Sequence, residues 1–493
     1  MTTSAAPGTA DVPPQFGSLM RRHRLRIGLT QRELADLSTI SVRAIRDLEQ
    51  GRATRPRTDT VRLIADGLRL GPRARADLES AAHQGRRSAA LHERFVTAPP
   101  APPVATHPLF GRDAEARVLT DELASGTERL VTMVGLSGVG KTRLALEVAA
   151  RLHREAQLPV LWHAVPGTGG EYRSDPDGEE FAGAVRALVE HLPATGDTDP
   201  APFLELVGDH PTVLVIDGAP DRPHADRLTR LLRECPQLRV LITSDHPSDV
   251  PGERVFLLAP LSTPDDVGES ASAGAGKSAS AGAGESASAG AEELTGMTAV
   301  QLFLSQVRRV QPEFVLDGRT AGAVADICRR LDGLPLALRA AADWLVVYDV
   351  ETLRECLASD PGALLDHLTD AREGARLRAC LERGLRGLDP GRHDLLDAVC
   401  AGDGEFGLED VMALTGRTLP ECGRLVRDLL LRGVVRPSHR PGRSRFQVLQ
   451  LVRAVWRDGV ARPAATAAAG VPEELPLGAA APVFDGLPRS SAH

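Results

Sequence analysis

Lysine is almost absent from this chain of 493 residues: it occurs only as Lys141 and Lys277, so nearly every cationic side chain is an arginine. Aromatic residues contribute only 3% of the sequence. The six cysteines are scattered, with no Cys-x-x-Cys pair and no histidine cluster at zinc spacing. This distribution argues against a zinc-binding or disulfide scaffold and predicts reduced cysteines in the core.

Long apolar segments are also missing, since no run of about 18 uncharged apolar residues occurs. The first residues lack a basic region followed by an apolar stretch, so we expect a cytoplasmic protein without a membrane partner. The apolar content of 42% and charged content of 25% fit a globular protein. A length of 493 residues favours about three domains at roughly 150 residues each.

The net charge of -8 conceals an uneven distribution. Residues 1–110 contain 17 arginines and 10 acidic residues, whereas the remainder of the chain is strongly acidic. A basic segment of this kind suits binding to a polyanion. We therefore expect the N-terminal part alone to contact nucleic acid.

The N-terminal half of the chain divides into three segments. Short helical patterns occupy residues 15–85, and the proline-rich stretch 98–108 predicts a linker over 86–107. Between 108 and 262, β-rich apolar runs alternate with helical segments. This alternation predicts a parallel α/β sheet.

The C-terminal half begins with a repeat. Three octamers of the type SASAGAGK predict a flexible insertion over 263–295. Helical periodicity marks residues 296–370, and a further unit over 376–461 contains a predicted hairpin. The Ala/Pro/Gly-rich residues 462–493 predict a disordered tail.

Two short helices are predicted to meet near residues 38–40, with Thr30 and Ser41 as their N-terminal caps. Ile45 and Leu48 of the second helix would face inward, so its opposite side would face outward. Side chains on that outer side could reach base edges in DNA, and others nearby could contact phosphates. The candidate DNA-binding residues are Gln31, Ser41, Val42, Arg43, Arg46, Asp47, Arg52 and Arg55, with Arg57 as a further phosphate contact.

This segment resembles the helix-turn-helix of the phage-repressor-like XRE family, which it matches through Leu-Thr-Gln (29–31), Glu-Leu-Ala (33–35) and Leu-Glu-Gln-Gly (48–51). The resemblance covers roughly 50 residues. It implies that Arg24 and Glu49 form a structural pair, so Arg24 is not counted as a DNA contact. The small glycine usual in the turn is absent, and Thr39 stands near its place.

The run GLSGVGKT (135–142) fits the pattern G-x-x-x-x-G-K-[ST], follows an apolar strand and precedes a helical segment. Main-chain amides of such a loop point at phosphate, the lysine reaches the β- and γ-phosphates, and the hydroxyl holds Mg²⁺. A lysine in a chain that otherwise uses arginine suggests a need for its compact ammonium. The candidate nucleotide-binding residues in and beside the loop are Gly135, Ser137, Gly138, Val139, Gly140, Lys141, Thr142 and Arg143.

The second apolar strand, TVLVID (212–217), ends in Asp217. A carboxylate there would hold Mg²⁺ together with Thr142, so Asp217 is both the candidate metal ligand and the candidate catalytic residue. The next residue is Gly218, where many hydrolytic P-loop enzymes have a second acidic residue. We therefore expect at most slow ATP hydrolysis.

From about residue 108 to 460 the chain resembles the NB-ARC class of STAND ATPases, through the phosphate loop, TVLVID (212–217), VLITS (240–244), LLAPLS (257–262) and GLPLAL (333–338). The resemblance implies that Pro335 contacts the adenine side of the nucleotide and that a winged helix closes over ADP. Three departures stand out. Asp245 lies where the family places an arginine, residues 448–450 read Val-Leu-Gln instead of Met-His-Asp, and no long repeat array follows.

Together these patterns predict a multidomain protein. It would contain an all-α helix-turn-helix domain, an α/β P-loop NTPase domain with a parallel sheet, a helical subdomain and a winged helix. The expected function is a nucleotide-regulated transcription regulator that binds double-stranded DNA. ADP, ATP and Mg²⁺ would control its self-association, and a separate signal-sensing protein could act on it. Two alternatives remain: a plain repressor with a degenerate structural P-loop domain, and a STAND-type defence or signalling ATPase.

Overall fold

The computed structural model describes residues 16–53, 56–165, 206–218, 225–264, 294–360, 388–402, 404–438 and 444–458, with a few shorter stretches between them. No helix in these ranges combines the length and the hydropathy that a membrane span requires. The octamer repeat and the expected C-terminal tail lie outside the described residues.

Four short helices form the N-terminal unit: α1 (Phe16–Arg26), α2 (Gln31–Ser38), α3 (Val42–Glu49) and α4 (Thr58–Gly67). Their apolar sides share one core, which includes Met20, Leu34, Ile45 and Ile64. Thr30 caps α2 through a capping box with Glu33, and Ser41 caps α3 by accepting from the Ala44 amide. Such caps satisfy amides that have no partner inside the helix and so fix where each helix begins. The two helices predicted to meet near residues 38–40 are therefore α2 and α3.

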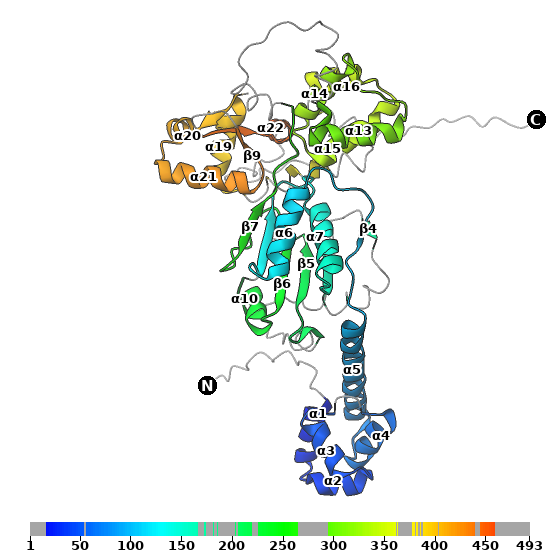
Figure 1. The fold of residues 1–493 in the computed structure, drawn as a ribbon. Coiled ribbons are helices and arrows are strands. Elements are labelled where there is room, and N and C mark those ends of the chain that lie inside the picture. The colour runs from blue at the N-terminus through cyan, green and yellow to red at the C-terminus, as the bar shows by residue number, and fades with distance from the viewer. Residues whose placement is uncertain are drawn as a thin grey trace, which may run out of the picture.

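A fifth helix, α5 (Pro72–Thr97), joins this unit to the sheet. Leu78 belongs to the N-terminal core, whereas Phe95 near the other end of α5 packs in a core of the α/β domain. Figure 1 shows α5 standing between the two units. The expected linker over 86–107 therefore begins later, because α5 continues to Thr97 and only the proline-rich stretch from residue 98 leaves the helix.

The α/β domain contains a five-stranded sheet in the order β3-β5-β6-β2-β7. The strands are β2 (Leu130–Val134), β3 (Val160–Ala164), β5 (Thr212–Asp217), β6 (Leu238–Ser244) and β7 (Arg254–Leu257). All four neighbouring pairs are parallel. A two-residue strand, β1 (Val104–Ala105), pairs antiparallel with β4 (Tyr172–Arg173) as a separate ribbon.

Alternate residues of the central strands face opposite sides of this sheet, and helices cover both sides. On one side, Val131 and Met133 share a core with α6 (Asp113–Ser125) and α7 (Lys141–Glu155). On the other side, Leu214 and Ile216 pack with α10 (Ala225–Glu234) and with Phe95 of α5. Every residue of β2 and β5 is buried, as expected for parallel strands covered on both faces.

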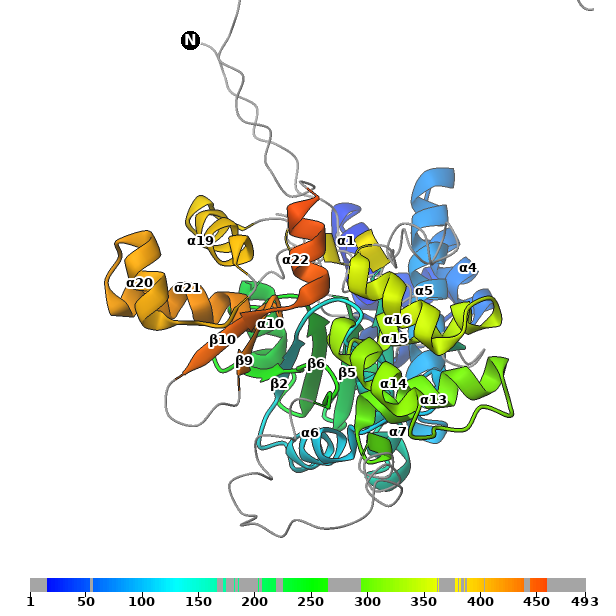
Figure 2. The same cartoon turned by 90° about the horizontal axis from the view of Figure 1, so that it is seen from above.

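Two further units lie over the carboxyl edge of the sheet, one on either side (Figure 2). The helical subdomain consists of α13 (Thr298–Val310), α14 (Thr320–Arg330), α15 (Pro335–Asp343), the 3-10 helix η1 (Trp344–Val346) and α16 (Val350–Ser359). The C-terminal unit, residues 388–458, contains α19 (Pro390–Ala401), β8 (Phe406–Gly407), α20 (Leu408–Thr415), α21 (Leu419–Leu431), β9 (Val435–Ser438), β10 (Arg445–Val448) and α22 (Gln450–Arg457).

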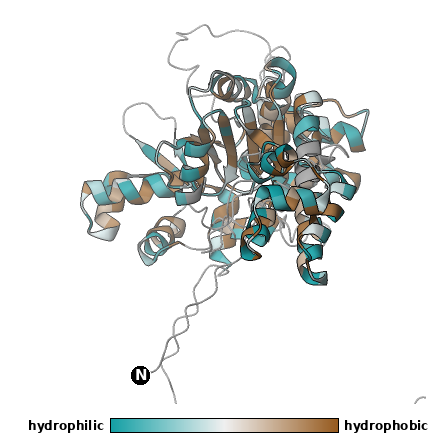
Figure 3. Ribbon diagram, turned by 90° about the horizontal axis from the view of Figure 1, so that it is seen from below, coloured by the Kyte–Doolittle hydropathy of each residue, from teal (hydrophilic) through white to brown (hydrophobic). Residues whose placement is uncertain are grey.

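The predicted hairpin in the C-terminal unit is the antiparallel pair of β9 and β10, and β8 adds a third strand. Figure 3 shows hydrophobic and hydrophilic residues alternating along the helices of the molecule. The buried sides of both units belong to the same core as α6 and α7. Packing therefore holds the helical subdomain and the C-terminal unit directly against the loops that leave the sheet.

Candidate functional site

The phosphate-loop motif connects β2 to α7 at the carboxyl edge of the sheet. Gly135, Gly138 and Gly140 have φ angles of 154°, 88° and 101°, which side-chain-bearing residues rarely adopt. A Cβ on Gly135 would lie 2.6 Å from the Leu258 carbonyl oxygen. The glycines therefore let the loop curl tightly, and Lys141 becomes the first residue of α7.

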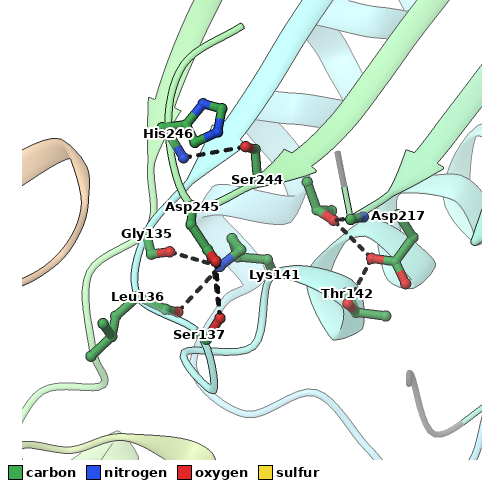
Figure 4. Close-up of polar contacts among 11 residues, drawn as sticks. Gly135, Leu136, Ser137, Lys141, Thr142, Asp217, Ser244, Asp245 and His246 are labelled. Atoms are coloured by element: carbon green, nitrogen blue, oxygen red, sulfur yellow. Dashed lines mark hydrogen bonds and ion pairs between the residues drawn. The ribbon is translucent and has the colours of Figure 1, made fainter. Parts of the chain in front are cut away.

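Lys141 lies across this loop, with three oxygen atoms around its ammonium (Figure 4). Its Nζ donates to the carbonyl oxygens of Gly135 at 2.7 Å and Leu136 at 3.3 Å. It also forms an ion pair with Asp245, with 2.7 Å between Nζ and Oδ1. Asp245 thus faces the loop, at the position where the family resemblance led us to expect a cation.

Asp217 and Thr142 meet beside the loop, although they are 75 residues apart. The Thr142 hydroxyl donates to Asp217 Oδ1 at 2.7 Å, and the Thr243 hydroxyl donates to the same oxygen at 2.8 Å. Thr243 also accepts from the Gly218 amide at 2.8 Å, which ties the end of β5 to β6. Burial raises the pKa of Asp217, and the hydroxyls of Thr142 and Thr243 partly oppose that shift.

These oxygens fit a magnesium ion, because Mg²⁺ in phosphate-loop proteins is held by a hydroxyl and a carboxylate together with phosphate oxygens. Thr142 Oγ1 and Asp217 Oδ1 already lie within 2.7 Å of each other. When bound, the ion would neutralise charge between phosphate oxygens. Thr243 was not identified from the sequence. The signal that could have found it is its position near the end of β6, the strand that pairs with β5 and places Thr243 opposite Asp217.

The remaining candidate nucleotide residues are spread around the loop. Ser137 donates to both Asp245 carboxylate oxygens at 3.2 Å, and Val139 is buried in the core. Arg143 points elsewhere, since its Nε donates to the His107 carbonyl at 2.7 Å and its guanidinium lies beside Glu147. Pro335 is the first residue of α15, and a Cβ on Gly140 of the loop would lie 4.0 Å from Pro335 Cγ.

The loop is contacted by both units above the sheet. In the helical subdomain, the Leu336 amide donates to the Gly138 carbonyl at 3.3 Å. In the C-terminal unit, Gly433 approaches so closely that a Cβ there would lie 2.5 Å from the Leu136 amide nitrogen. A ligand in the loop would therefore lie at the junction of three parts of the chain.

Asp332 links the two upper units to each other. Its Oδ2 accepts from the Leu451 amide at 3.0 Å, across 119 residues, at the start of α22. Burial raises the pKa of Asp332 to about 6, against the opposing effects of the Gln450 and Leu451 amides. No sequence pattern had indicated this contact.

A second candidate site lies in the N-terminal unit, where Glu49 gathers two donors. Arg24 donates to Glu49 through Nε at 2.6 Å and through a second nitrogen at 2.9 Å, so the expected structural pair is present. Gln31 also donates to Glu49, at 2.7 Å, although we expected it to contact phosphate. Burial alone would raise the pKa of Glu49, but the hydrogen bonds from Arg24 and Gln31 lower it overall. Thr39 has a φ of 56°, the left-handed conformation that glycine would adopt more easily.

The outer side of α3 carries the other candidate DNA contacts. Arg43, Arg46 and Arg52 are exposed, and Val42 and Asp47 are partly exposed. Arg43 Nε lies 3.8 Å from Asp47 Oδ2. Ser41 is exposed but is engaged as the cap of α3, and Arg55 lies outside the described residues. The structure thus brings an arginine-rich surface together on one helix and the turn after it.

Comparison with known families divides the chain in the same way. Residues 15–78 match a family described as a helix-turn-helix domain, and residues 108–248 match one described as an AAA ATPase domain. The chain therefore joins a helix-turn-helix domain to an AAA ATPase domain.

Curated relatives share part of the chain. An uncharacterized protein of Mycobacterium tuberculosis is 29% identical over 238 residues, which are 47% of this chain and 49% of that protein. A second protein of that organism, with the provisional name of an HTH-type transcriptional regulator, is 30% identical over 217 residues, which are 43% of this chain and 20% of that protein. The match thus spans at most about half the length of these relatives.

Two solved structures align with low scores. One is a STAND protein with a tetratricopeptide repeat sensor from Pyrococcus horikoshii, with a TM-score of 0.28 and 15% identity over 72% of this chain and 43% of that one. The other is the Drosophila ORC bound to DNA, with a TM-score of 0.26 and 14% identity over 75% of this chain and 91% of that one.

Proposed function

We propose that this protein is a cytoplasmic, nucleotide-regulated transcription regulator, in which ADP or ATP with Mg²⁺ controls how the helix-turn-helix domain binds double-stranded DNA. ADP favours a form in which the C-terminal unit, acting as the winged helix of an NB-ARC-like switch, is closed on the phosphate loop. Exchange for ATP favours an open form that self-associates. Binding energy, more than turnover, drives the change, because Gly218 follows Asp217 where a hydrolytic enzyme usually has a second acid.

One observation carries the proposal: the phosphate loop is contacted at once by the helical subdomain and the C-terminal unit. Leu336 hydrogen-bonds to Gly138, and Gly433 lies against Leu136. A ligand shifts an equilibrium between two forms only when it binds them with different affinity. A nucleotide at this junction meets that condition, since opening the units would change the surroundings of its phosphates.

The DNA-binding part of the proposal rests on α3 and the turn after it. Arg43 and Arg46 extend from α3 into solvent, and Arg52 follows in the turn. Exposed arginines on the second helix of a helix-turn-helix can reach base edges or phosphates in the major groove. The helix α5 then connects this surface to the sheet through Phe95, which is 1% exposed.

The proposal is tested by comparing two nucleotide states of the full chain. Protein stripped of nucleotide is loaded with ADP or with a non-hydrolysable ATP analogue, and its oligomeric state and retention of genomic DNA fragments are measured. With the ATP analogue we expect a larger oligomer of the protein. We also expect tighter DNA binding, because two helix-turn-helix domains in one oligomer bind DNA with avidity. Identical elution and identical DNA retention in both states would refute the switch.

A second candidate is a plain repressor whose phosphate-loop domain is structural. The ion pair between Lys141 and Asp245 favours it, because the ammonium that would bind phosphate already has an anion. A ligand at 100 times its dissociation constant stabilises the folded protein by about 2.7 kcal/mol. If neither ADP nor ATP raised the melting temperature, this second function would replace the first.

A further inference from the structure

Asp245 occupies a central position at the carboxyl edge of the sheet. It directly follows β6, which lies between β5, carrying Asp217, and β2, leading into the phosphate loop. Asp245 contacts the phosphate loop through Ser137 and Lys141, and the candidate magnesium ligands lie at the same edge of the sheet. In Figure 4 its carboxylate lies over the loop, next to the Lys141 ammonium and above Ser137.

The ammonium of Lys141 has no donor left for a nucleotide in this arrangement. An ammonium has three N–H donors, and Lys141 Nζ has three protein oxygens within 3.3 Å: those of Gly135, Leu136 and Asp245. Two of them belong to the main chain of the loop itself. The Asp245 carboxylate is the one that a side-chain rotation can remove.

Asp245 also resembles a phosphate in its other contacts. Ser137 Oγ lies 3.2 Å from each carboxylate oxygen, so an anion is held by a loop hydroxyl and the loop lysine together. Of these two groups, the lysine is the one that binds phosphate in loops of this type. The pair is partly shielded from water, since the side chains of Lys141 and Asp245 are 11% and 20% exposed.

We infer that Asp245 is an internal competitor for the phosphate site and sets the nucleotide preference of the protein. A nucleotide binds only when the carboxylate leaves Lys141, and the negative charge that remains nearby opposes a triphosphate more than a diphosphate. The inference rests on the proposed function, because it assigns to this site a preference for ADP. A preference for ADP stabilises the closed form until the concentration of ATP is high or a partner moves the Asp245 side chain.

A cation of the C-terminal unit lies within electrostatic reach of the same carboxylate. Arg432 is the C-cap residue that follows α21, and it precedes Gly433, which lies against the loop. Burial lowers the pKa of Arg432, and the charge of Asp245 is among those that oppose this shift. Movement of the Asp245 carboxylate therefore changes the charge that the C-terminal unit faces.

The test uses Asp245→Asn, which keeps the shape of the side chain and removes its charge. Asp249→Asn is the matched control, because Asp249 lies on the same loop, is exposed, and has a φ of 56° that asparagine tolerates. Both variants and the wild-type full chain are stripped of nucleotide and titrated calorimetrically with ADP, ATP and inorganic pyrophosphate. Each titration is repeated with and without Mg²⁺.

We expect Asp245→Asn to bind ADP about tenfold more tightly than the wild type, which is about 1.4 kcal/mol. The gain should be larger for ATP, because the Asp245 carboxylate competes for Lys141 and repels the phosphates, and ATP carries more negative charge than ADP. Asp249→Asn should bind like the wild type. Pyrophosphate should follow ADP, because the competition concerns phosphate and not the base.

The outcomes separate the inference from the proposed function. If the wild type binds nucleotide and Asp245→Asn binds no more tightly, the proposed function stands and the competitor role is wrong. If Asp245→Asn gained the same affinity for ADP as for ATP, Asp245 would not set the nucleotide preference, and the inference would also be wrong. If no protein binds any of the three ligands, both the inference and the proposed function are wrong.

Discussion

The ion pair between Arg24 and Glu49 is nearly closed to solvent, with side-chain exposures of 8% and 3%. Removing Arg24 leaves the Glu49 carboxylate buried with the neutral Gln31 side chain as a hydrogen-bond donor and without its ion-pair partner, and breaking a buried pair in this way costs about 3 kcal/mol or more. We therefore expect Arg24→Met to destabilise the N-terminal unit strongly, measured as a lower midpoint of denaturant unfolding followed by helical circular dichroism.

Arg43→Met is the control for that measurement, since the Arg43 side chain is 91% exposed and its carboxylate neighbour is 3.8 Å away. Exposed pairs contribute less than about 1 kcal/mol, so its unfolding midpoint should stay near that of the wild type. If Arg43 reads a base, its loss should relax sequence preference at one position by about 1–3 kcal/mol. Equal destabilisation by both variants would contradict the structural role of Arg24.

The buried carboxyl of Asp332 gives the contact between the two upper units a pH dependence. Its folded-state pKa of about 6 lies above the ordinary value of 3.8, so the folded state binds the proton more tightly. The stability from this group is complete below pH 3.8 and is lost as pH rises through 6. Arg436 and Arg453 face the same carboxyl and favour its ionised form.

We expect protection of the Leu451 amide against hydrogen exchange to decrease between pH 5 and pH 7.5 by about 1.4 kcal/mol, or about tenfold, after correction for the intrinsic rate. Asp332→Asn is the reference, because its amide oxygen can still accept from Leu451 but does not titrate. If wild type and variant showed the same pH dependence, the titration of Asp332 would not control this contact.

At the scale of elements, the close approach of the C-terminal unit to the phosphate loop can be tested with two glycines. Gly433 and Gly416 have φ angles of 70° and 66°, so alanine strains the backbone equally at both, by about 1–2 kcal/mol. Only at Gly433 would the new Cβ meet the loop, at Leu136, whereas nothing lies within 4 Å of a Cβ at Gly416.

We therefore expect Gly433→Ala to weaken ADP binding by about tenfold, because the added methyl pushes the C-terminal unit away from the loop. Gly416→Ala should lose stability without a change in ADP affinity. Titration of both variants beside the wild type measures the difference. Equal ADP affinity in the two variants would show that the contact with Leu136 does not affect nucleotide binding.

Local sequence patterns predicted the strand, loop and helix of the phosphate site well. They could not predict contacts between residues that are far apart in the sequence. The run from Gly135 to Thr142 predicted its own strand, loop and helix, because the motif is contiguous and its glycines fix the turn. Asp245 was noticed as an anion where a cation was expected, but its distance of 104 residues from Lys141 hid the ion pair. The Asp332 contact depends on how whole units pack, and no residue spacing encodes that.

The helix α5 shows a different limit of sequence reasoning. The proline-rich stretch 98–108 begins where α5 ends, but the predicted start of the linker at residue 86 lies twelve residues too early, because α5 continues to Thr97. Nothing in the local composition of residues 86–97 indicated that Phe95 would be buried in a core formed by the distant Phe181 and Phe203. Burial of Phe95 anchors α5 on the sheet, so the helix-turn-helix domain is attached by a helix and not by a coil alone.

At the scale of the whole molecule, the proposal links a phosphate site at one end of the sheet to a DNA-binding surface beyond the other (Figure 1). No contact between the phosphate loop and α3 is required for this link. If the upper units open and two chains associate, each α5 presents a DNA-binding domain, and the second domain binds at a high effective concentration. Nucleotide would then control DNA occupancy through the number of helix-turn-helix domains that are brought together, and not through a change in their conformation.

Lys141 is the residue whose loss should separate DNA binding from nucleotide control. The Lys141→Ala variant keeps α3 and its arginines intact but lacks the ammonium that reaches phosphate, so a single chain should still bind DNA at its lower, unpaired affinity. Genome-wide footprinting should then give weak sites that are unchanged between ADP-rich and ATP-rich conditions, while wild-type sites gain occupancy with ATP. Lys277→Ala is the matched control, because it removes the other lysine of the chain from the octamer repeat. Footprints of Lys141→Ala that followed the nucleotide as strongly as those of the wild type would show that control of DNA binding does not pass through the phosphate loop.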